Sequence, residues 1–359
     1  MNGKLRAAVV GATGMVGQRF ITLLRNHPYF ELAAVAASSR SAGQKYKDAV
    51  AGRWKMAEEI PPSVADMTVL DGSDIEAVGR AADFIFCAVD MKKDEIRALE
   101  EAYAKAEIPV ISNNSANRWT SDVPMVIPEI NDEHLGVIAS QRERLGTKRG
   151  FIAVKPNCSI QSYVPLLTPL LKFGIREVVA TTYQAISGAG RNFESWPEMV
   201  DNVIPYIGGE EEKSEREPLK IWGELRGGTI VPAEAPLITT QCIRVPVTDG
   251  HTAAVFVNFE NKPPKEAIIA EWRTFRGVPQ LLNLPSAPEH FITYFDEDDR
   301  PQIKLDRGIY GGMGITAGRL RPDTMFDYKF VGMSHNTLRG AAGGAVLIAE
   351  LLFRQGYLS

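Results

Sequence analysis

The sequence predicts an α/β protein built on a doubly wound parallel sheet, followed by a second domain of α+β type. In the first half, short apolar runs alternate with helical patterns, as in strand–helix–strand repeats. From about residue 150 the apolar runs become longer and follow one another more directly. The 359 residues also exceed what one hydrophobic core usually holds, so we expect two domains.

The elements of the first half follow from hydrophobic periodicity. A buried strand is expected over 5–10, and a helix over 15–26 with Val16, Phe20, Leu23 and Leu24 on one face. Further strands are expected at 31–37, 84–89 and 109–112, with a charged helix at 93–106. We place the first domain at residues 1–149.

The second domain is expected at 150–334. A strand over 151–154 leads into a helix that begins near Cys158, and β-rich runs follow at 177–186, 239–247 and 253–259. These runs predict a mostly antiparallel sheet. The last segment, 335–359, begins with a helix rich in glycine and alanine that can pack closely, and we expect it to return to the first domain. Charge runs at 210–217 and 296–299 are typical of solvated faces.

Composition excludes several classes of partner. The formal net charge of −4 argues against a nucleic acid or a membrane surface, because such partners need a basic face. No apolar run approaches the roughly 18 residues of a membrane span, and the N-terminus does not resemble a signal peptide. Three scattered cysteines without a CxxC pair predict neither disulfides nor a metal site. A reducing cytoplasm is expected.

Three glycines stand between the first expected strand and the first expected helix. The segment GATGMVG spans Gly11 to Gly17 with the spacing GxxGxxG. Glycines there let the turn tighten and let the backbone approach a pyrophosphate, which the free N–H groups of the helix N-terminus would bind. This position predicts a Rossmann-type dinucleotide site, although tight turns also use glycine for steric reasons alone.

The end of the second expected strand bears on the cofactor. NAD enzymes usually carry Asp or Glu there for the ribose hydroxyls. This chain has Ser38, Ser39, Arg40 and Ser41 instead. Hydroxyls and a guanidinium suit a 2′-phosphate, so the sequence favours NADP. The alternative is a polar loop with one ordinary arginine.

A candidate nucleophile follows the strand expected at 151–154. Cys158 lies in KPNCS, where a helix is expected to begin, and a helix N-terminus lowers a thiol pKa. A thiolate both attacks and leaves a carbonyl carbon readily. The alternative is a small buried residue, which is how we interpret Cys87 and Cys242 within their strands.

A thiolate needs an acid or base as a partner. Among the five histidines, His251 lies in a turn between two β runs, seven residues after Arg244. This arrangement can bring an imidazole and a cation to one pocket. His27 and His335 lie near helix ends and are interpreted as capping or surface residues.

Taken together, these motifs resemble one family. GATGMVGQRF, SSRSAG, NNSANRWTSDVPMVIPEIN, KPNCS, YQAISGAG, NVIPYI, EEEK, PLKI, RVPVTDGHT and HNTLRGAAGG occur in the order seen in aspartate-β-semialdehyde dehydrogenases, most like the archaeal and fungal branch. The match runs from Val10 to about Gly344. It departs at Ile160, where threonine is common, and at Pro165, which should interrupt the helix after Cys158.

The resemblance implies roles for individual residues. Cys158 would form an acyl thioester, His251 would act as acid and base, and Gln184 would orient the reacting intermediate. The implied substrate contacts are Arg244 for the α-carboxylate, Glu217 for the ammonium, Lys220 as its companion in the phosphate region, and Arg118 and Asn157 for the phosphate. The implied NADP contacts are Gly11, Thr13, Gly14, Met15, Val16, Ser38, Ser39, Arg40, Ser41, Ser187, Gly188 and Asn336.

The implied reaction is the reversible NADPH-dependent reductive dephosphorylation of L-aspartyl-4-phosphate to aspartate 4-semialdehyde. The implied partners are the small-molecule substrate and phosphate, in a homodimer or homotetramer that pairs through the second, catalytic and dimerisation domain. Alternatives are a malonyl-CoA reductase, an N-acetyl-glutamyl-phosphate reductase and a non-catalytic NADP-binding protein. The amino-acid substrate is favoured by Asn157 and by the set Glu217, Lys220 and Arg244, whereas intact Cys158, Gln184 and His251 argue against a non-catalytic protein.

Overall fold

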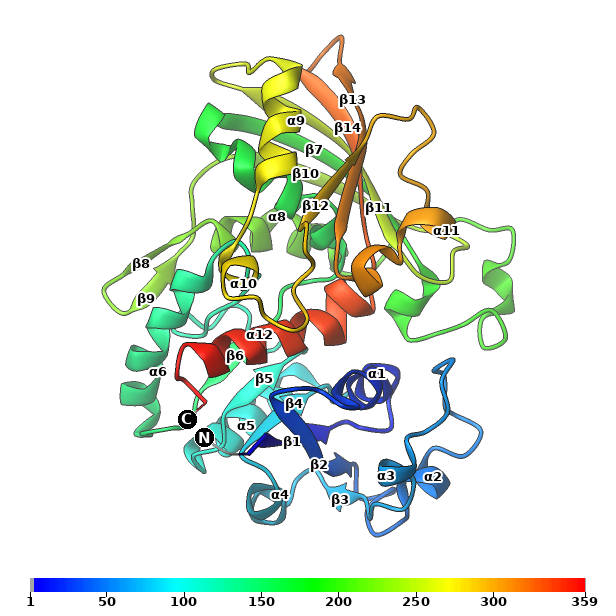
Figure 1. Ribbon diagram of the computed structural model, residues 1–359, viewed down its shortest axis with the longest axis vertical. Coiled ribbons are helices and arrows are strands. Elements are labelled where there is room, and N and C mark those ends of the chain that lie inside the picture. The colour runs from blue at the N-terminus through cyan, green and yellow to red at the C-terminus, as the bar shows by residue number, and fades with distance from the viewer. Residues whose placement is uncertain (1–2, 359) are drawn as a thin grey trace.

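The computed structural model describes residues 3–358 and contains two six-stranded sheets (Figure 1). All strand pairs of the first sheet are parallel. Its spatial order is β3 (Leu70–Asp71), β2 (Phe30–Ala37), β1 (Leu5–Val10), β4 (Phe84–Cys87), β5 (Val110–Ser112) and β6 (Ile152–Val154). The order 3-2-1-4-5-6 is that of doubly wound dinucleotide-binding folds, so the predicted fold class is confirmed.

Helices cover both faces of this sheet. The helices of this region are α1 (Met15–Leu24), α2 (Tyr46–Ala49), α3 (Pro62–Ala65), α4 (Ile75–Ala81), α5 (Lys93–Lys105), η1 (Asp132–Val137) and α6 (Ile138–Leu145). On one face, Phe20 and Ile21 of α1 share a buried cluster with Val9 of β1. On the other face, Val78 of α4 and Tyr103 of α5 are buried in a second cluster.

The strand at 152–154 corrects one expectation from the sequence. Its apolar run lies just after the change of pattern near residue 150, so the sequence predicts it as part of the second domain. In the structure β6 pairs in parallel with β5, with Val110 opposite Ile152, and forms the edge of the first sheet. Cys158 therefore follows the last strand of the dinucleotide-type sheet.

The second sheet is mixed. Its order is β10 (Leu237–Arg244), β7 (Ile175–Gln184), β11 (His251–Phe259), β14 (Tyr328–Ser334), β13 (Ile315–Pro322) and β12 (Ile292–Phe295). The pairs β7–β11, β11–β14 and β13–β14 are antiparallel, whereas β10–β7 and β12–β13 are parallel. The remaining elements are η2 (Ser159–Ser162), α7 (Val164–Leu167), η3 (Thr168–Phe173), η4 (Ile186–Ala189), η5 (Pro197–Met199), α8 (Glu210–Ile221), β8 (Glu224–Arg226), β9 (Thr229–Val231), α9 (Lys265–Thr274), α10 (Val278–Leu281), α11 (Ile303–Asp306) and η6 (Ile309–Gly312).

Only one face of the second sheet is deeply buried. On β11, Ala253, Val255 and Val257 are buried together with Leu166 of α7. The residues between them point to the opposite face and are half-buried, among them the aromatic Phe256. The strand thus carries apolar side chains on both faces.

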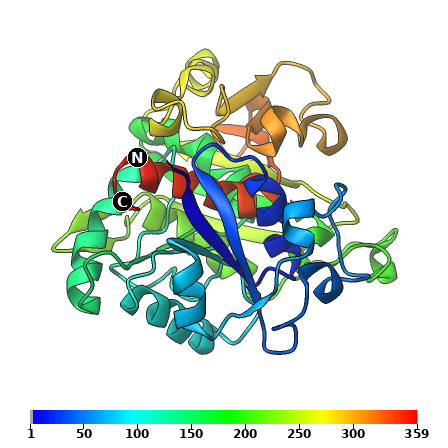
Figure 2. The same ribbon diagram turned by 60° about the horizontal axis from the view of Figure 1, so that its bottom comes forward.

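The C-terminal segment returns to the first sheet. It forms a π-helical turn, η7 (Leu338–Ala342), and then α12 (Gly343–Arg354). Figures 1 and 2 both show α12 (red) passing between the N-terminal sheet and the rest of the molecule. Its apolar residues join the cluster that contains α1 and β1. Within residues 3–358, no helix is both long and apolar enough to cross a membrane.

Candidate active site

A cavity of about 490 Å³ lies beyond the carboxyl ends of the first sheet. Loops after β1, β4, β5 and β6 contribute to it, together with residues of the second domain. Its lining is Met15, Val16, Arg19, Val89, Asp90, Met91, Lys93, Ile96, Asn113, Asn114, Ser115, Arg118, Asn157, Cys158, Ser187, Gly188, Gly190, Glu210, Lys213, Asn336, Thr337, Gly340 and Ala341. Ligands of doubly wound sheets bind at this edge.

The glycine turn has the geometry of a phosphate cradle. Gly11 has a φ of +92°, and a Cβ there would lie 2.3 Å from the carbonyl oxygen of Ala88. Gly14 is exposed and has only ordinary contacts, which leaves the first turn of α1 open at the cavity. Met15 and Val16 line the cavity beside it, so a bound pyrophosphate fits here.

The serine-rich loop lies beside this turn. The N–H group of Gly11 donates to Ala36 of β2 at 2.9 Å, and Ser38, Ser39 and Arg40 are exposed directly after that strand. Ser41 is buried. The structure therefore brings an exposed guanidinium and two exposed hydroxyls next to the dinucleotide-type turn, although they are not part of the cavity wall.

On the opposite wall, Asn336 connects two loops. Its Nδ2 donates to Ser187 Oγ at 2.8 Å, and its Oδ1 accepts the N–H of Gly250 at 2.8 Å. Gly250 immediately precedes His251. The predicted cofactor contacts Ser187, Gly188 and Asn336 thus meet in the cavity next to the histidine.

Cys158 and His251 are brought together from distant parts of the chain. Cys158 Sγ lies 3.5 Å from His251 Nε2. Cys158 is half-buried and faces the cavity, whereas His251, at the start of β11, is fully buried. Gly340 of η7 closes one side of the thiol, because a Cβ there would lie 2.8 Å from Cys158 Cβ.

The hydrogen bonds of His251 select its tautomer. Its Nδ1 accepts the backbone N–H of Ala185 at 3.0 Å, so in the neutral ring the proton is on Nε2, which faces the thiol. Burial, followed by the charge of Arg244, lowers the pKa of His251 to about 3. The ring is therefore neutral near pH 7 and presents a proton donor to Cys158.

The local structure around Cys158 and the direction of its pKa shift differ from those that the sequence predicts. The sequence predicts a helix N-terminus that lowers the pKa of Cys158. Instead, Cys158 precedes a four-residue 3₁₀ turn, and the chain is broken again at Tyr163 before Pro165. So short a turn has little dipole. Burial, and then the charge of Glu210, raises the pKa of Cys158, opposed by the cations Lys155, Arg118 and Arg244.

Arg244 ends β10 beside the histidine. Its NH1 donates to Ala185 O at 2.6 Å, and a Cβ on Gly188 would lie 3.0 Å from the same nitrogen. Gln184, the last residue of β7, lies opposite Arg244 in the strand pairing and is buried. Three of the predicted residues, Gln184, Arg244 and His251, thus meet at one corner of the second sheet.

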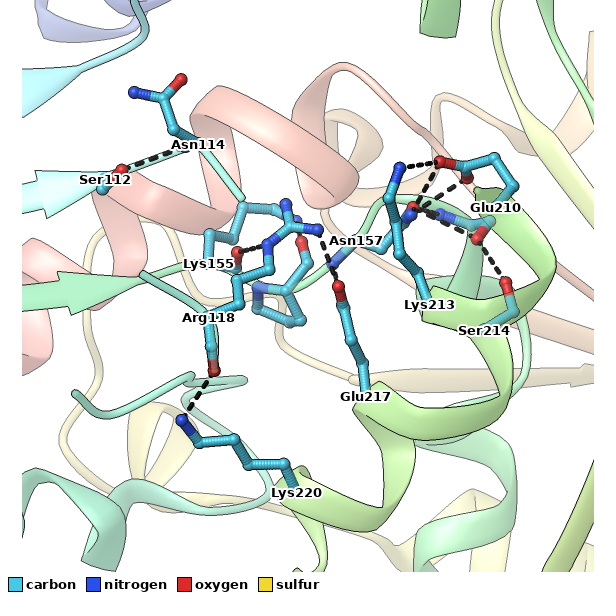
Figure 3. Close-up of polar contacts among 12 residues, drawn as sticks. Ser112, Asn114, Arg118, Lys155, Asn157, Glu210, Lys213, Ser214, Glu217 and Lys220 are labelled. Atoms are coloured by element: carbon cyan, nitrogen blue, oxygen red, sulfur yellow. Dashed lines mark hydrogen bonds and ion pairs between the residues drawn. The ribbon is translucent and has the colours of Figure 1, made fainter. Parts of the chain in front are cut away.

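Glu210 lines the cavity although it was not among the predicted site residues. Its carboxylate accepts hydrogen bonds from Asn157 Nδ2 at 3.0 Å and Lys213 Nζ at 2.8 Å (Figure 3). It also accepts one from Gln184 Nε2 at 3.2 Å. Burial favours the neutral acid, but the charge of Lys213 and these hydrogen bonds outweigh it and lower the pKa of Glu210. An ionised carboxylate therefore faces the cavity close to Cys158.

The predicted substrate residues Glu217 and Lys220 lie elsewhere. Glu217 is fully buried, pairs with Arg118 NH1 at 2.9 Å and accepts the backbone N–H of Asn157 at 2.6 Å. Lys220 Nζ donates to three backbone carbonyls of the loop at 118–123. Neither contributes to the cavity wall, whereas Arg118 and Asn157 do.

The sequence contained the signal for Glu210. The pattern E-x-x-K occurs twice in α8, as Glu210–Lys213 and Glu217–Lys220. Seven residues are about two helical turns, so both pairs share one face of the helix. Only the first pair reaches the cavity. Glu210 and Lys213, the N-terminal of the two pairs, therefore supply the carboxylate and the ammonium that face the cavity.

A dinucleotide-type sheet whose cavity holds a cysteine against a histidine defines an oxidoreductase that works through a thiol. Comparisons agree with this class. Residues 6–138 match the family model "Semialdehyde dehydrogenase, NAD binding domain", and residues 167–339 match "Semialdehyde dehydrogenase, dimerisation domain".

The chain is 45% identical to aspartate-semialdehyde dehydrogenase of Methanothermobacter thermautotrophicus, over 97% of this chain and 99% of that protein. The Aspergillus fumigatus enzyme is 42% identical over 99% of both. A crystal structure of the Candida albicans enzyme with NADP superimposes with a TM-score of 0.89 at 39% identity, covering 99% of this chain and 100% of that one. The chain belongs to the aspartate-semialdehyde dehydrogenase family, which confirms the resemblance seen in its motifs.

Proposed function

We propose that this protein catalyses the reversible NADPH-dependent reduction of L-aspartyl-4-phosphate to L-aspartate 4-semialdehyde, a step of the aspartate pathway to lysine, threonine and methionine. The observation that carries the proposal is the contact of buried His251 with Cys158, whose thiol lines a cavity shared with the N-terminus of α1. The family relationship supplies the substrate class.

The chemistry follows from the side chains at the cavity. The Cys158 thiolate attacks the acyl carbon, a C–S bond forms, and the C–O bond to phosphate breaks. When bound, NADPH would supply the hydride that reduces the resulting thioester. His251 Nε2–H lies beside Cys158 Sγ, where it would stabilise the oxyanion that develops on the carbon bound to sulfur and move the proton as the C–S bond breaks.

Charged residues around the thiol suit the two ends of an aspartyl phosphate. Glu210 is proposed to take the substrate ammonium, and Arg244 the α-carboxylate. Arg118 and Lys213 line the cavity as cations for the phosphate. The amide of Asn157 is bound to Glu210, so we assign it the role of fixing that carboxylate.

The cofactor is proposed to bind along the glycine turn, with its 2′-phosphate at Ser38, Ser39 and Arg40. These side chains are exposed beside the turn, and no acidic residue occupies 38–41. The contact residues proposed for NADP are Gly11, Thr13, Gly14, Met15, Val16, Ser38, Ser39, Arg40, Ser41, Ser187, Gly188 and Asn336.

We also propose that two copies pair through the open face of the second sheet, as a homodimer or as the unit of a homotetramer. Half-buried Phe256 on β11 and exposed Tyr183 on β7 supply apolar area there. Sedimentation of the wild type and of Phe256→Asp tests the pairing.

A nucleophilic thiol suits a reducing compartment, which we take to be the cytoplasm.

The function is tested by following NADP reduction with aspartate semialdehyde, with and without phosphate. Malonyl-CoA with NADPH is assayed in parallel. Phosphate-dependent turnover of the semialdehyde supports the proposal. Turnover of malonyl-CoA alone would assign the chain to the CoA-dependent relatives instead.

A further inference from the structure

Lys155 is a buried lysine without an acidic partner, three residues before Cys158. Its side chain is 1% exposed. Within residues 3–358, the one hydrogen bond that its Nζ makes is to Pro156 O, at 2.7 Å. An ammonium has three N–H donors, so this environment leaves it poorly satisfied. Neither the cavity lining nor the hydrogen bonds described above give Lys155 a role.

The neighbouring cations Arg118 and Arg339 each form an ion pair with a carboxylate, and Lys155 does not. Arg118 donates to the Glu217 carboxylate, and Arg339 forms a two-fold pair with Glu129 at 2.8 and 2.9 Å. No ion pair involves Lys155 among the described residues. The void that Lys155 shares with Gln161, Arg339 and Gly344 has no room for a water molecule. Its charge therefore has no carboxylate in direct contact and no water beside it. The charge of Glu217 favours the ammonium without an ion pair, and Glu217 is already paired with Arg118.

The glycine-rich segment formed by η7 and the start of α12 packs against both Lys155 and Cys158. A Cβ on Gly340 would lie 2.8 Å from Cys158 Cβ, and one on Gly344 would lie 3.1 Å from Lys155 Cε. The two glycines are four residues apart, on either side of the non-helical residue Ala341. Bare backbone thus lets both side chains pack closely against this one segment.

His251 does not fill the place of a cationic partner for the thiolate. Its Nδ1 accepts the N–H of Ala185, and a doubly protonated ring would place N–H against N–H. The remaining charges that act on Cys158 are the unfavourable Glu210 and the favourable Lys155, Arg118 and Arg244. Of the three cations, Lys155 opposes the burial of the thiol most strongly.

We propose that Lys155, in its protonated form, is the cation that balances the Cys158 thiolate, and so acts on catalysis through the nucleophile as a positioning residue. In the resting pair Cys–SH and Lys–NH₂ exchange for Cys–S⁻ and Lys–NH₃⁺, with no net proton lost or gained. Burial lowers the pKa of Lys155 to about 7, and the Cys158 charge acts in the opposite direction. The ammonium is therefore stabilised when the thiolate is present.

The test measures the thiol directly. Lys155→Met keeps the length and removes the charge. The rate of alkylation of Cys158 by iodoacetamide is followed from pH 5 to 10, with Cys158→Ser giving the background from Cys87 and Cys242. In Lys155→Met we expect the midpoint of the alkylation rate against pH to rise by about one pH unit, with roughly tenfold slower alkylation at neutral pH. An unchanged midpoint in a folded variant overturns the proposal.

Two further measurements separate charge from packing. Lys220→Met also removes a buried ammonium, but not one that acts on Cys158, and its midpoint should stay at the wild-type value. An equal shift in both variants would contradict the proposal. If Lys155→Met does not fold, the ¹³Cε signal of Lys155 is titrated in wild type and in Cys158→Ser. Its pKa should fall in the serine variant, and an equal pKa refutes the pairing.

This inference rests on the proposed role of Cys158, but its readout needs no substrate. A failure of the aspartate semialdehyde assay with a normal Lys155 effect would reject the substrate and leave the pair intact. Normal turnover in Lys155→Met, with an unshifted thiol, would reject the pair and leave the function intact.

Discussion

The carboxylate of Glu217 lies 2.9 Å from the guanidinium of Arg118, and both side chains are almost fully buried. The same carboxylate accepts the backbone N–H of Asn157, the residue before Cys158. One acid thus fixes both a cavity arginine and the loop that carries the nucleophile. Glu217 does not line the cavity, whereas Glu210, two helical turns earlier, does.

The two glutamates provide matched variants. Glu210→Gln should narrow the preference for aspartate semialdehyde over succinate semialdehyde, because an ionised carboxylate no longer meets the substrate ammonium. Losing a partner of this kind costs about 2 kcal/mol in a partly wet cavity, or roughly 30-fold in kcat/KM. Glu217→Gln should lower kcat/KM for both aldehydes alike. If only Glu217→Gln changes the ratio, the assignment of the two acids must be reversed.

Cys158→Ser should reduce kcat by more than about a hundredfold while NADP still binds, because a serine hydroxyl beside neutral His251 is a far weaker nucleophile than a thiolate. Cys242→Ser is the control, since Cys242 is buried in β10 next to Ser214 and does not reach the cavity. Turnover and cofactor affinity are measured separately. A loss of less than tenfold, or about 1.4 kcal/mol, would place the nucleophile elsewhere.

Arg40→Asp should shift the cofactor preference from NADP toward NAD. The new carboxylate would repel a 2′-phosphate and could accept the ribose hydroxyls. The ratio of kcat/KM with NADP to kcat/KM with NAD should fall by at least tenfold. Arg53→Asp, in the same region of the chain, serves as a charge control. An unchanged ratio for Arg40→Asp would show that the 2′-phosphate binds away from β2.

Arg244→Lys should raise KM for the semialdehyde strongly and leave thiol alkylation close to wild type. A guanidinium offers two parallel donors to a carboxylate, and an ammonium is a single point charge. One donor of Arg244 is already bound to Ala185 O, which fixes the orientation of the rest. A variant with normal KM would show that the substrate carboxylate is bound by another group.

His251 should make the protein less stable in acid. The pKa of His251 in the folded state is about 3, below the ordinary value of 6.5. Between these two values the unfolded chain therefore binds a proton at this residue that the folded chain does not bind. The stabilisation is therefore complete above pH 6.5 and declines toward pH 3, by up to about 1.4 kcal/mol per pH unit. Urea midpoints of His251→Asn should change less between pH 7.5 and 4.5 than those of wild type. The exposed His290→Asn should behave like wild type, and equal slopes for all three proteins would contradict the prediction.

Much of the first sheet could be predicted, because each strand and helix carries its own periodicity. The strand at 5–10 has the expected bounds, and the helices beginning at Met15 and Lys93 start where expected. The strand at 152–154 was harder to assign, since its apolar run does not show which sheet it pairs with. Pairing between residues 110 and 152 depends on tertiary contacts that no local pattern encodes.

Some residues of the candidate site could likewise be predicted from the sequence, and others could not. Cys158 and His251 could be chosen from their motifs, and the structure brings them into contact. The two E-x-x-K pairs of α8 could not be told apart, because a spacing of seven residues places both on one helical face. The burial of Lys155 also left no sequence signal, since lysine is ordinarily exposed and only the packing of η7 and α12 encloses it.

Cys158 and the first turn of α1 line the same cavity, and Gly340 closes the thiol on its far side. A dinucleotide seated on α1 would therefore stand across the path by which peroxide or other small oxidants approach the sulfur. An enzyme molecule without cofactor would then be both inactive and open to oxidation at Cys158. The susceptibility of this thiol to oxidative damage would follow the occupancy of the dinucleotide site, whichever oxidation state of the cofactor fills it.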